Sequence, residues 1–501
     1  MGLEIRRRIR DNLYGSVDIS SLEDEVIAHP FFQRLRRIRQ TAFLNLVFPG
    51  ASHSRFEHSL GVMHLAGMAW SKIKDNQLRI RAVCGKYRNF SERERQRLPS
   101  EPLEGYLSPS FSVMDRLFSS SYVLQTLRLA ALLHDVGHPP FSHSGERFLP
   151  DGATVLSSNP QIPPYLATYL SSRSVTHQKR VSHEVFTVLI VDQILSDIYL
   201  RKPDLALKVV AQDLASLIIP QIPPAPGSEL AACGAQSLCH ELISGEMDID
   251  RMDYLRRDAR ECGVAYGIFD SDRILDSLAA YANVEDGRIH LALQYSGLPA
   301  FEDYLRARQS MYLQLYFHKT STACEAMMQR LADQLKHWHI PANVMDYCQI
   351  DEYEIRSVFL KAGRETLPPS EQPNFSALVH DLLVNRRLWK MIYEISADSK
   401  RHDSMREELQ TVLTGLHQVS ITTELVSSHN VLSKFRNRKT GQRSENYLRL
   451  IKKDGRQFPR VEAIEDYSSI IQETGVVFHR IYVRRDDAGQ AERVLREALD
   501  A

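Results

Sequence analysis

Residues 132–143 read Leu-Leu-His-Asp-Val-Gly-His-Pro-Pro-Phe-Ser-His, and the interpretation of the whole chain starts from them. The apolar residues 122–133 predict a helix that runs directly into His134 and Asp135. A glycine and two prolines then end this helix. Two side chains that can bind metals therefore stand together at the buried end of a helix, and two more histidines lie on the turn that follows.

This His-Asp pair has an ordinary explanation and a functional one. In the ordinary one, the histidine lies on the helix dipole and the aspartate forms a salt bridge. In the functional one, a cation compensates the buried carboxylate, which would otherwise be costly, with an imidazole beside it. An isolated pair favours the ordinary explanation, whereas the neighbouring motifs described below favour a metal.

Composition excludes several classes of protein. The chain has 501 residues, 43% of them hydrophobic and 25% charged, which is typical of two or three globular domains with full cores. Lys+Arg and Asp+Glu balance at 62 each, so net charge does not indicate bulk nucleic-acid binding. The six cysteines form no C-x-x-C pair, and neither a signal peptide nor a membrane-spanning run is apparent. We expect a cytoplasmic protein with no membrane partner.

Two further histidines open predicted helices. His58 lies in the first turn of a helix expected over 55–74, on the face that also carries Arg55. His183 follows Ser182 at the start of another helix. A lone histidine in such a place is usually a cap or a core residue, but an arginine and a histidine together can meet an anion and a metal.

Two predicted helices carry polar stripes. In the first, helical spacing places Asp250, Tyr254 and Asp258 on one face with Arg251 at its edge, whereas Asp253 lies off this line and can pair with an arginine. The ordinary alternative is a surface helix with ion pairs.

In the second helix, expected over about 300–337, Arg308, Tyr312, Tyr316 and Lys319 recur on one face. Cations at both ends with tyrosines between them suit the phosphates and the base or sugar of a nucleotide. The alternative is an exposed amphipathic face.

The pattern along the chain predicts a mainly α-helical fold. A large helical lobe over 1–345 contains a polar insertion at about 85–120, and a smaller α+β lobe follows over 346–501. For the smaller lobe we expect an oligomerisation or regulatory role. The other expected elements are a hairpin over 282–294, short helices over 351–361, 375–384 and 387–395, a loop over 437–443, a strand over 475–485 and a helix over 489–499.

Four motifs occur in order along the chain: Arg-Phe-Glu-His at 55–58, His-Asp-x-Gly-His-x-Pro-Phe-Ser-His at 134–143, Ser-His-Glu at 182–184 and Asp-x-Asp-Arg-x-Asp-Tyr at 248–254. Together they resemble the HD-domain deoxynucleoside triphosphate triphosphohydrolases, and residues 48–62 most resemble the members with a SAM domain. This resemblance implies an HD-type metal-dependent catalytic domain that converts a dNTP and water to deoxynucleoside and inorganic triphosphate. We expect no SAM-type domain here.

The resemblance also implies individual roles. The metal ligands would be His58, His134, Asp135 and Asp250, a mixed N/O set suited to one Mn, Fe or Zn ion, with additional Mg on the triphosphate. His143 and Glu146 would activate the attacking water, His183 would protonate the leaving 5′ oxygen and His138 would contact phosphate.

The remaining implied roles concern the substrate. The residues expected to bind it are Arg55, Arg251, Arg308 and Lys319 at the triphosphate, Gln40 and Asp258 at the 3′-hydroxyl, Tyr316 against a 2′-hydroxyl, and Tyr254 and Tyr312 on the same face. The resemblance further implies a homo-oligomer. Ala28 stands where GTP-activated relatives carry an acid, so we expect a different activator or none.

Two other functions remain open at this point. One is an HD phosphodiesterase or phosphatase that acts on another nucleotide or on single-stranded nucleic acid, against which Arg308, Lys319 and Tyr316 argue. The other is a non-catalytic nucleotide sensor, against which the filled metal and acid–base positions argue.

Overall fold

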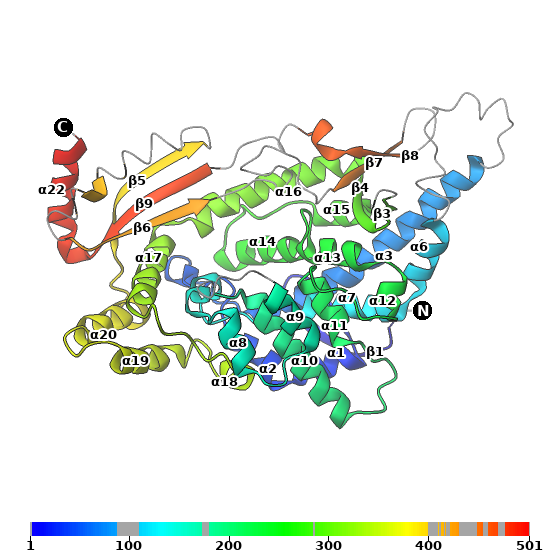
Figure 1. Ribbon diagram of the computed structural model, residues 1–501. Coiled ribbons are helices and arrows are strands. Elements are labelled where there is room, and N and C mark those ends of the chain that lie inside the picture. Colours follow the sequence, from blue (N-terminus) through cyan, green and yellow to red (C-terminus); the bar gives the residue numbers. More distant parts are fainter. Residues whose placement is uncertain are drawn as a thin grey trace.

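The computed structural model describes residues 3–87, 110–172, 180–283, 286–398, 421–429, 448–453, 459–468 and 476–499, with a few positions between 409 and 416. The fold is mainly helical, as predicted, and two of its small sheets lie along one side of the helical body (Figure 1). The expected loop over 437–443, and 88–109 of the expected insertion, lie outside the described residues. Within the described residues, no helix is both long and apolar enough to cross a bilayer.

The centre of the body is α7 (Ser121–Leu133), the helix predicted to precede the His-Asp pair. The side chain of Ser120 accepts a hydrogen bond from the Val123 amide and so caps its first turn. Most of the helix is buried, including Leu127 and Leu129. Because α7 is surrounded by other elements, its C-terminal end delivers His134 and Asp135 into the interior.

Two long helices bring the other motifs to this point. α3 (Arg55–Tyr87) packs against α7 and extends beyond the expected end at residue 74. α14 (Ile249–Cys262) packs against α3; Asp248 caps its start, and Gly263, in the left-handed conformation with φ 69°, ends it. A third helix, α10 (His183–Arg201), contacts the turn after α7 through Gly137 and Thr187.

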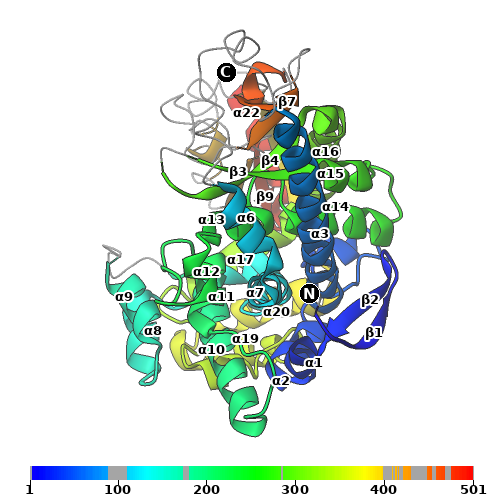
Figure 2. The same ribbon diagram turned by 90° about the vertical axis from the view of Figure 1, so that its right-hand side faces the viewer.

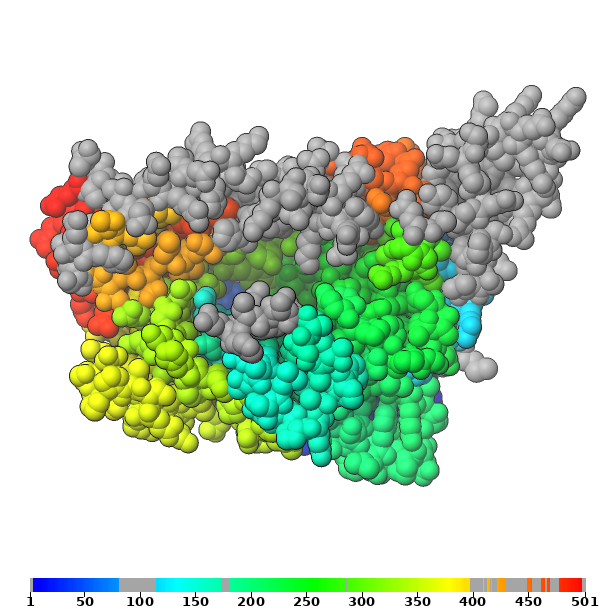
Figure 3. All heavy atoms as spheres, in the orientation of Figure 1, coloured from blue at the N-terminus to red at the C-terminus, as the bar shows by residue number. Residues whose placement is uncertain are grey.

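Other helices complete the body. They are α1 (Ser21–Ala28), α2 (Pro30–Gln33), α6 (Ser110–Ser119), α8 (Gly152–Ser158), α9 (Pro164–Ser172), α11 (Ala211–Ile218), α12 (Glu229–Ala232), α13 (Gln236–Ser244), α15 (Ser271–Ser277), α18 (Val344–Tyr347), α19 (Ile355–Thr366), α20 (Gln372–His380) and α22 (Ala488–Leu499). Of these, α8 and α9 form part of the surface between α19–α20 and the segment around α10 (Figure 3).

Three small sheets flank the helices. β1 (Ile5–Asp11) and β2 (Gly15–Ser20) form an antiparallel hairpin beside α1 and α3 (Figure 2). β3 (Leu278–Ala282) and β4 (Ile289–Gln294) form the hairpin predicted over 282–294, which β7 (Arg449–Lys453) and β8 (Pro459–Ala463) extend. The third sheet has the order β5-β9-β6, with β5 (Lys390–Asp398), β6 (Thr423–His429) and β9 (Val476–Val483).

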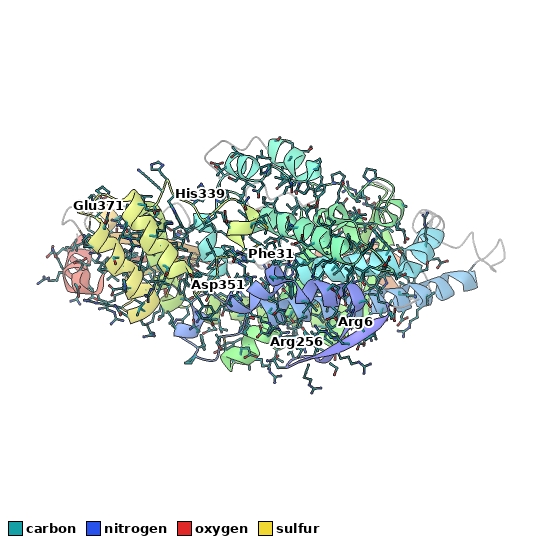
Figure 4. All side chains as sticks on the ribbon, turned by 90° about the horizontal axis from the view of Figure 1, so that it is seen from below. Arg6, Phe31, Arg256, His339, Asp351 and Glu371 are labelled. Carbon is teal, nitrogen blue, oxygen red and sulfur yellow. The ribbon has the colours of Figure 1, made fainter. Side chains whose placement is uncertain are left out.

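The view from below separates the two ends of the molecule. Arg6 on β1 and Arg256 on α14 lie towards the hairpin side, whereas Glu371 lies at the opposite end, beside α20 (Figure 4). Between them, Asp351 accepts a hydrogen bond from Arg37 and so ties the chain before α19 to the N-terminal region.

Three sequence predictions about the secondary structure were wrong. Residues 387–395 were expected to be helical, but most of them form β5, because pairing with β9 satisfies their backbone groups and overrides local propensity. The continuous helix over 300–337 divides into α16 (Leu298–Met311), a π-helical turn (Tyr312–Tyr316) and α17 (Lys319–Gln334). The helical segment expected over 20–45 breaks at Pro30 into short helices and 3-10 turns.

We predict that Gly137→Ala destabilises the fold by about 1–3 kcal/mol, as overpacked cores do. A Cβ at this position would lie 2.2 Å from the Thr187 amide nitrogen and 2.5 Å from the His183 carbonyl oxygen, so the turn would have to separate from α10. Urea denaturation measures the loss. Gly489→Ala is the matched control, because its Cβ would meet no atom within 4 Å; equal stability of the two variants would contradict the prediction.

Candidate active site

Side chains from three separate segments converge on one buried point. His58 comes from the first turn of α3, His134 and Asp135 from the end of α7, and Asp250 from the first turn of α14. His58 Nε2 lies 3.0 Å from Asp250 Oδ1 and 3.5 Å from Asp135 Oδ2. His134 Nε2 lies 3.4 Å and 3.5 Å from oxygens of the same two carboxylates. The structure therefore brings together all four residues predicted as metal ligands.

The polar atoms at this point fit a divalent cation. Nε2 of His58 and Nε2 of His134 are buried and have no hydrogen-bond partner within the part of the chain that the structure describes. The opposite ring nitrogens are engaged, since His58 Nδ1 lies 2.8 Å from Asp253 Oδ2 and His134 Nδ1 lies 2.8 Å from the Ala131 carbonyl. Ligating histidines are usually oriented in this way, with the second nitrogen bonded to a carboxylate or carbonyl.

The electrostatics keep both carboxylates ionised. Burial would raise the pKa of Asp135, but the charges of Arg55 and His134 outweigh it and hold that pKa well below its usual value. Burial also opposes ionisation of Asp250, yet the adjacent imidazoles of His134 and His58 keep its pKa low. Metal ligands must be deprotonated, so the two aspartates are in the form that a cation requires.

A second cluster lies beside the first. The rings of His138 and His183 stack with their centres 3.6 Å apart, and Nδ1 of His183 lies 2.5 Å from Glu146 Oε1. Nδ1 of His143 lies 3.2 Å from the same oxygen, so Glu146 contacts both histidines. Asp135 Oδ1 lies 3.3 Å from His138 Nε2, and this aspartate therefore faces both clusters.

The pKa values of the two stacked histidines are shifted in opposite directions. Burial lowers the pKa of His183, but hydrogen bonding to Glu146 outweighs it, so the pKa is raised from its ordinary value. Burial and the charge of Arg55 both hold the pKa of His138 well below that value. One ring of the pair therefore favours the protonated form and the other the neutral form.

A strained turn carries His143. Phe141 and Ser142 both adopt left-handed conformations, with φ of 63° and 54°, which are uncommon for residues other than glycine. Ser142 Oγ accepts a hydrogen bond from Arg55 Nε at 3.1 Å and donates one to the Arg39 carbonyl at 2.9 Å. Strain of this kind persists where surrounding contacts enforce it, often at functional sites.

A cavity of about 360 Å³ opens over both clusters, within the range of small-molecule sites. Beyond the predicted residues, its wall includes an apolar patch of Leu217, Ile218 and Ile243, and the carboxyl group of Glu325. The predicted residues on the wall are Gln40, Arg55, His134, Asp135, His138, His143, His183, Asp250, Tyr254, Asp258, Tyr312 and Tyr316.

Three predicted cations do not line this cavity. Arg251 forms an ion pair with Asp248 at 2.7 Å, and Arg308 lies 3.8 Å from Glu246. Lys319 is exposed at the start of α17. The π-helical turn changes the helical phase after Tyr316, so Lys319 does not continue the face that an uninterrupted helix would give it.

Three tyrosines form one wall of the cavity, which we call the tyrosine wall: Tyr254, Tyr312 and Tyr316. The Tyr316 ring centre lies 6.2 Å from that of Tyr254 and 5.0 Å from that of Tyr312. The Tyr316 hydroxyl donates to Asp258 Oδ2 at 2.6 Å, and His53 Nε2 lies 2.7 Å from Asp258 Oδ1. Asp258 is therefore held from two sides.

Sequence reasoning missed several residues of the site. Asp253 was expected only to pair with an arginine; it does pair with Arg257, and it also holds His58. Its spacing from Arg257 was visible, but its contact with α3 was not. His53 lies in a segment with no helical or strand periodicity, so no sequence pattern placed it at the site. No motif or spacing around Glu325 indicated that it lines the cavity.

Comparison with known proteins agrees with these motifs. Residues 122–258 match the model of the HD domain family. The chain contains an HD domain. This confirms the resemblance predicted from the four motifs, and an HD domain implies a divalent metal, for which His58, His134, Asp135 and Asp250 offer donor atoms.

The relatives include named and unnamed proteins. The chain is 28% identical over 322 residues to an uncharacterized protein of Methanocaldococcus jannaschii, which covers 64% of this chain and 48% of that protein. It is 24% identical over 332 residues to the deoxynucleoside triphosphate triphosphohydrolase SAMHD1 of Bos taurus, covering 64% and 46% respectively. The chain spans about half the length of these curated relatives.

Two solved structures share the fold over nearly the whole chain. One is a hypothetical protein from Aquifex aeolicus, with 23% identity, a TM-score of 0.62 and coverage of 98% of this chain and 99% of that one. The other is a phosphohydrolase from Bacteroides thetaiotaomicron, with 21% identity, a TM-score of 0.58 and coverage of 96% and 100%. At these identities the likeness establishes the architecture alone.

We predict that Asp253→Asn weakens divalent-metal affinity by roughly 10–100-fold, the usual effect of losing a residue that orients a ligand. The amide removes the charge that fixes the His58 ring. Competition with a metallochromic chelator measures the affinity. Asp213→Asn is the control, because Asp213 is an equally buried carboxylate that binds Tyr122 and the Ala225 amide away from the site. Wild-type affinity in a folded Asp253→Asn protein would refute the role.

Proposed function

We propose that this protein hydrolyses deoxynucleoside triphosphates to deoxynucleosides and inorganic triphosphate, and that His58, His134, Asp135 and Asp250 hold the divalent metal it needs. The observation that carries this proposal is the joining of two arrangements in one cavity. His134, Asp135 and Asp250 line the cavity, with His58 Nε2 3.0 Å from Asp250 Oδ1, and the tyrosine wall and Asp258 line the same cavity. Relatives named deoxynucleoside triphosphate triphosphohydrolases support the choice of substrate.

The protein's own residues supply the acid–base chemistry. A bound divalent cation contributes Lewis-acid polarisation and a lowered pKa for bound water. Glu146 fixes His183 through Nδ1, so that Nε2 of the protonated ring can give a proton to the leaving 5′ oxygen. His143, held by the same carboxylate, accepts the proton of the attacking water. His138, whose pKa is held low, stacks on His183 and contacts phosphate.

We place the sugar of the substrate next to Tyr316 and Asp258, whose side chains are hydrogen-bonded to each other. Tyr316, Asp258 and Gln40 all line the cavity, and the Tyr316 hydroxyl donates to Asp258. Asp258 and Gln40 bind the 3′-hydroxyl of the substrate. A 2′-hydroxyl would crowd the ring, and ribonucleotides are therefore excluded.

Binding of the triphosphate by Arg251 and Arg308 requires these two side chains to move. Arg55 already lines the cavity, next to Asp135 and Ser142. Arg251 and Arg308 lie behind the tyrosine wall beside Asp248 and Glu246, and they reach phosphate oxygens by exchanging these acidic contacts for the substrate. Phosphate competes well for arginine because it accepts two parallel hydrogen bonds.

One observation favours a second candidate, hydrolysis of a nucleotide with fewer phosphates. Of the four predicted triphosphate cations, only Arg55 is on the cavity wall. Incubation with each dNTP and NTP and with the matching mono- and diphosphates, followed by ion-exchange separation of the products, distinguishes the two. Deoxynucleoside and triphosphate in equal amounts from a dNTP are expected; intact dNTPs together with hydrolysis of a mono- or diphosphate would instead support the second candidate.

Several features of the proposed enzyme remain predictions. They are the choice of Mn, Fe or Zn, additional Mg on the triphosphate, a homo-oligomer, a nucleotide activator other than GTP or none, and a cytoplasmic location. The division into a catalytic domain over 1–345 and an oligomerisation or regulatory lobe over 346–501 is likewise a prediction.

We predict that Tyr316→Ala lowers the preference for dATP over ATP by about tenfold or more in kcat/KM, equivalent to ~1.4 kcal/mol. Removal of the ring opens space for the 2′-hydroxyl, whereas Tyr316→Phe keeps the ring and loses only the bond to Asp258. Steady-state kinetics on both nucleotides gives the ratio. An unchanged ratio in Tyr316→Ala would contradict the exclusion by Tyr316.

A further inference from the structure

We propose that Arg480 and Tyr482, on the C-terminal strand β9, are positioning residues for the tyrosine wall. They hold Phe317, His318 and the first turn of α17, a segment that we call the 317–322 connection, and thereby set the position of Tyr316. The proposal rests on the proposed function, since it assigns the C-terminal sheet a role in nucleotide binding at the same cavity.

Arg480 makes the main contact. Its side chain is 7% exposed, and Nη1 donates to the carbonyl oxygen of Phe317, the residue directly after Tyr316. The same nitrogen donates to Thr322 Oγ1 at 3.0 Å. Nε donates to Glu394 Oε2 on β5 at 2.6 Å, so the neighbouring strand fixes the guanidinium from the other side.

Two further residues of β9 reach the same connection. The fully buried Tyr482 donates its hydroxyl to the Lys319 carbonyl at 2.9 Å. The ring of Phe478 packs edge-on against Phe317, with the centres 6.2 Å apart. Side chains two residues apart in a strand point to the same face, so positions 478, 480 and 482 present one face of β9 to the 317–322 connection.

The local backbone explains why this connection needs outside support. α16 passes into the π-helical turn, and α17 begins after His318, whose Nδ1 accepts from the Thr320 amide as a cap. The last carbonyls of a helix lack partners within it, and Phe317 carries one of these. A charge-assisted hydrogen bond from a buried arginine to that carbonyl is stronger than a neutral one and has a defined direction.

The position of the contact separates this role from ordinary core packing. Tyr312 and Tyr316 both lie in the π-helical turn that the connection follows, and the Tyr316 hydroxyl donates to Asp258 on the cavity wall. The four predicted metal ligands come from α3, α14 and the end of α7 instead. Loss of the β9 contacts should therefore disturb nucleotide binding and leave the metal site intact.

The test uses Arg480→Lys, Tyr482→Phe and a matched control. Lysine keeps the charge but cannot bond Phe317, Thr322 and Glu394 together. Phenylalanine removes only the hydroxyl of Tyr482. Arg485→Lys is the control, because Arg485 donates to the Leu388 carbonyl at 2.9 Å in the same lobe without contacting the 317–322 connection. Thermal melts and metal content verify that each variant is folded and loaded.

We expect KM for the preferred dNTP to rise at least fivefold in Arg480→Lys and Tyr482→Phe, with kcat within about twofold of wild type and metal content unchanged. The dNTP/NTP preference should fall in both, and neither change should occur in Arg485→Lys. In a Tyr316→Ala background, Arg480→Lys should add little, because the residue it positions is gone. Unchanged KM and preference, or an equal further loss in that background, would overturn the proposal.

Hydrogen exchange makes the test independent of the substrate. Amides of residues 312–319 should exchange faster in Arg480→Lys than in Arg485→Lys. If wild-type protein hydrolyses no dNTP, the proposed function fails, and the exchange rates alone decide whether β9 positions the wall. If dNTPs are hydrolysed but exchange at 312–319 is unchanged, the positioning role fails while the function stands.

Discussion

The approach of two imidazole nitrogens and two carboxylates in a buried space constrains the rest of the structure. His58 Nε2 and His134 Nε2 face Asp135 and Asp250 at 3.0–3.5 Å, and the side chains of His58 and Asp135 are buried. A cation would compensate these charges, and the surrounding contacts orient the donor atoms. Asp253 holds His58, and Arg257 in turn holds Asp253 through two hydrogen bonds of 2.8 and 3.0 Å.

Segments that are distant in the sequence contact one another around the predicted metal ligands. Asp135 faces the predicted metal ligands with one oxygen and His138 with the other, so this one carboxylate joins the two clusters. Tyr316 bonds to Asp258 on α14, the helix that also carries Asp250. β9 then supports the chain directly after Tyr316. The C-terminal sheet is thus structurally continuous with the candidate active site.

Local patterns predicted the parts of the fold that local chemistry determines. The helix before His134, the hairpin around Gly287 and the final strand followed predictable periodicity, and the four motifs indicated the metal ligands. Three features escaped prediction. β5 requires its partner β9, which is distant in the sequence, and the π-helical turn interrupts an apparently continuous helix. Arg251 pairs with Asp248 three residues earlier rather than lining the cavity, a local contact that the role implied by the motif did not take into account.

The most direct test of the central claim is an anomalous difference map from crystals of the metal-loaded protein, collected at the absorption edge of the bound metal. The account predicts one peak at roughly 2.0–2.3 Å from His58 Nε2, His134 Nε2 and an oxygen each of Asp135 and Asp250. A peak held instead by His138, His143, Glu146 and His183, or fully loaded crystals with no peak among the four ligands, would contradict it.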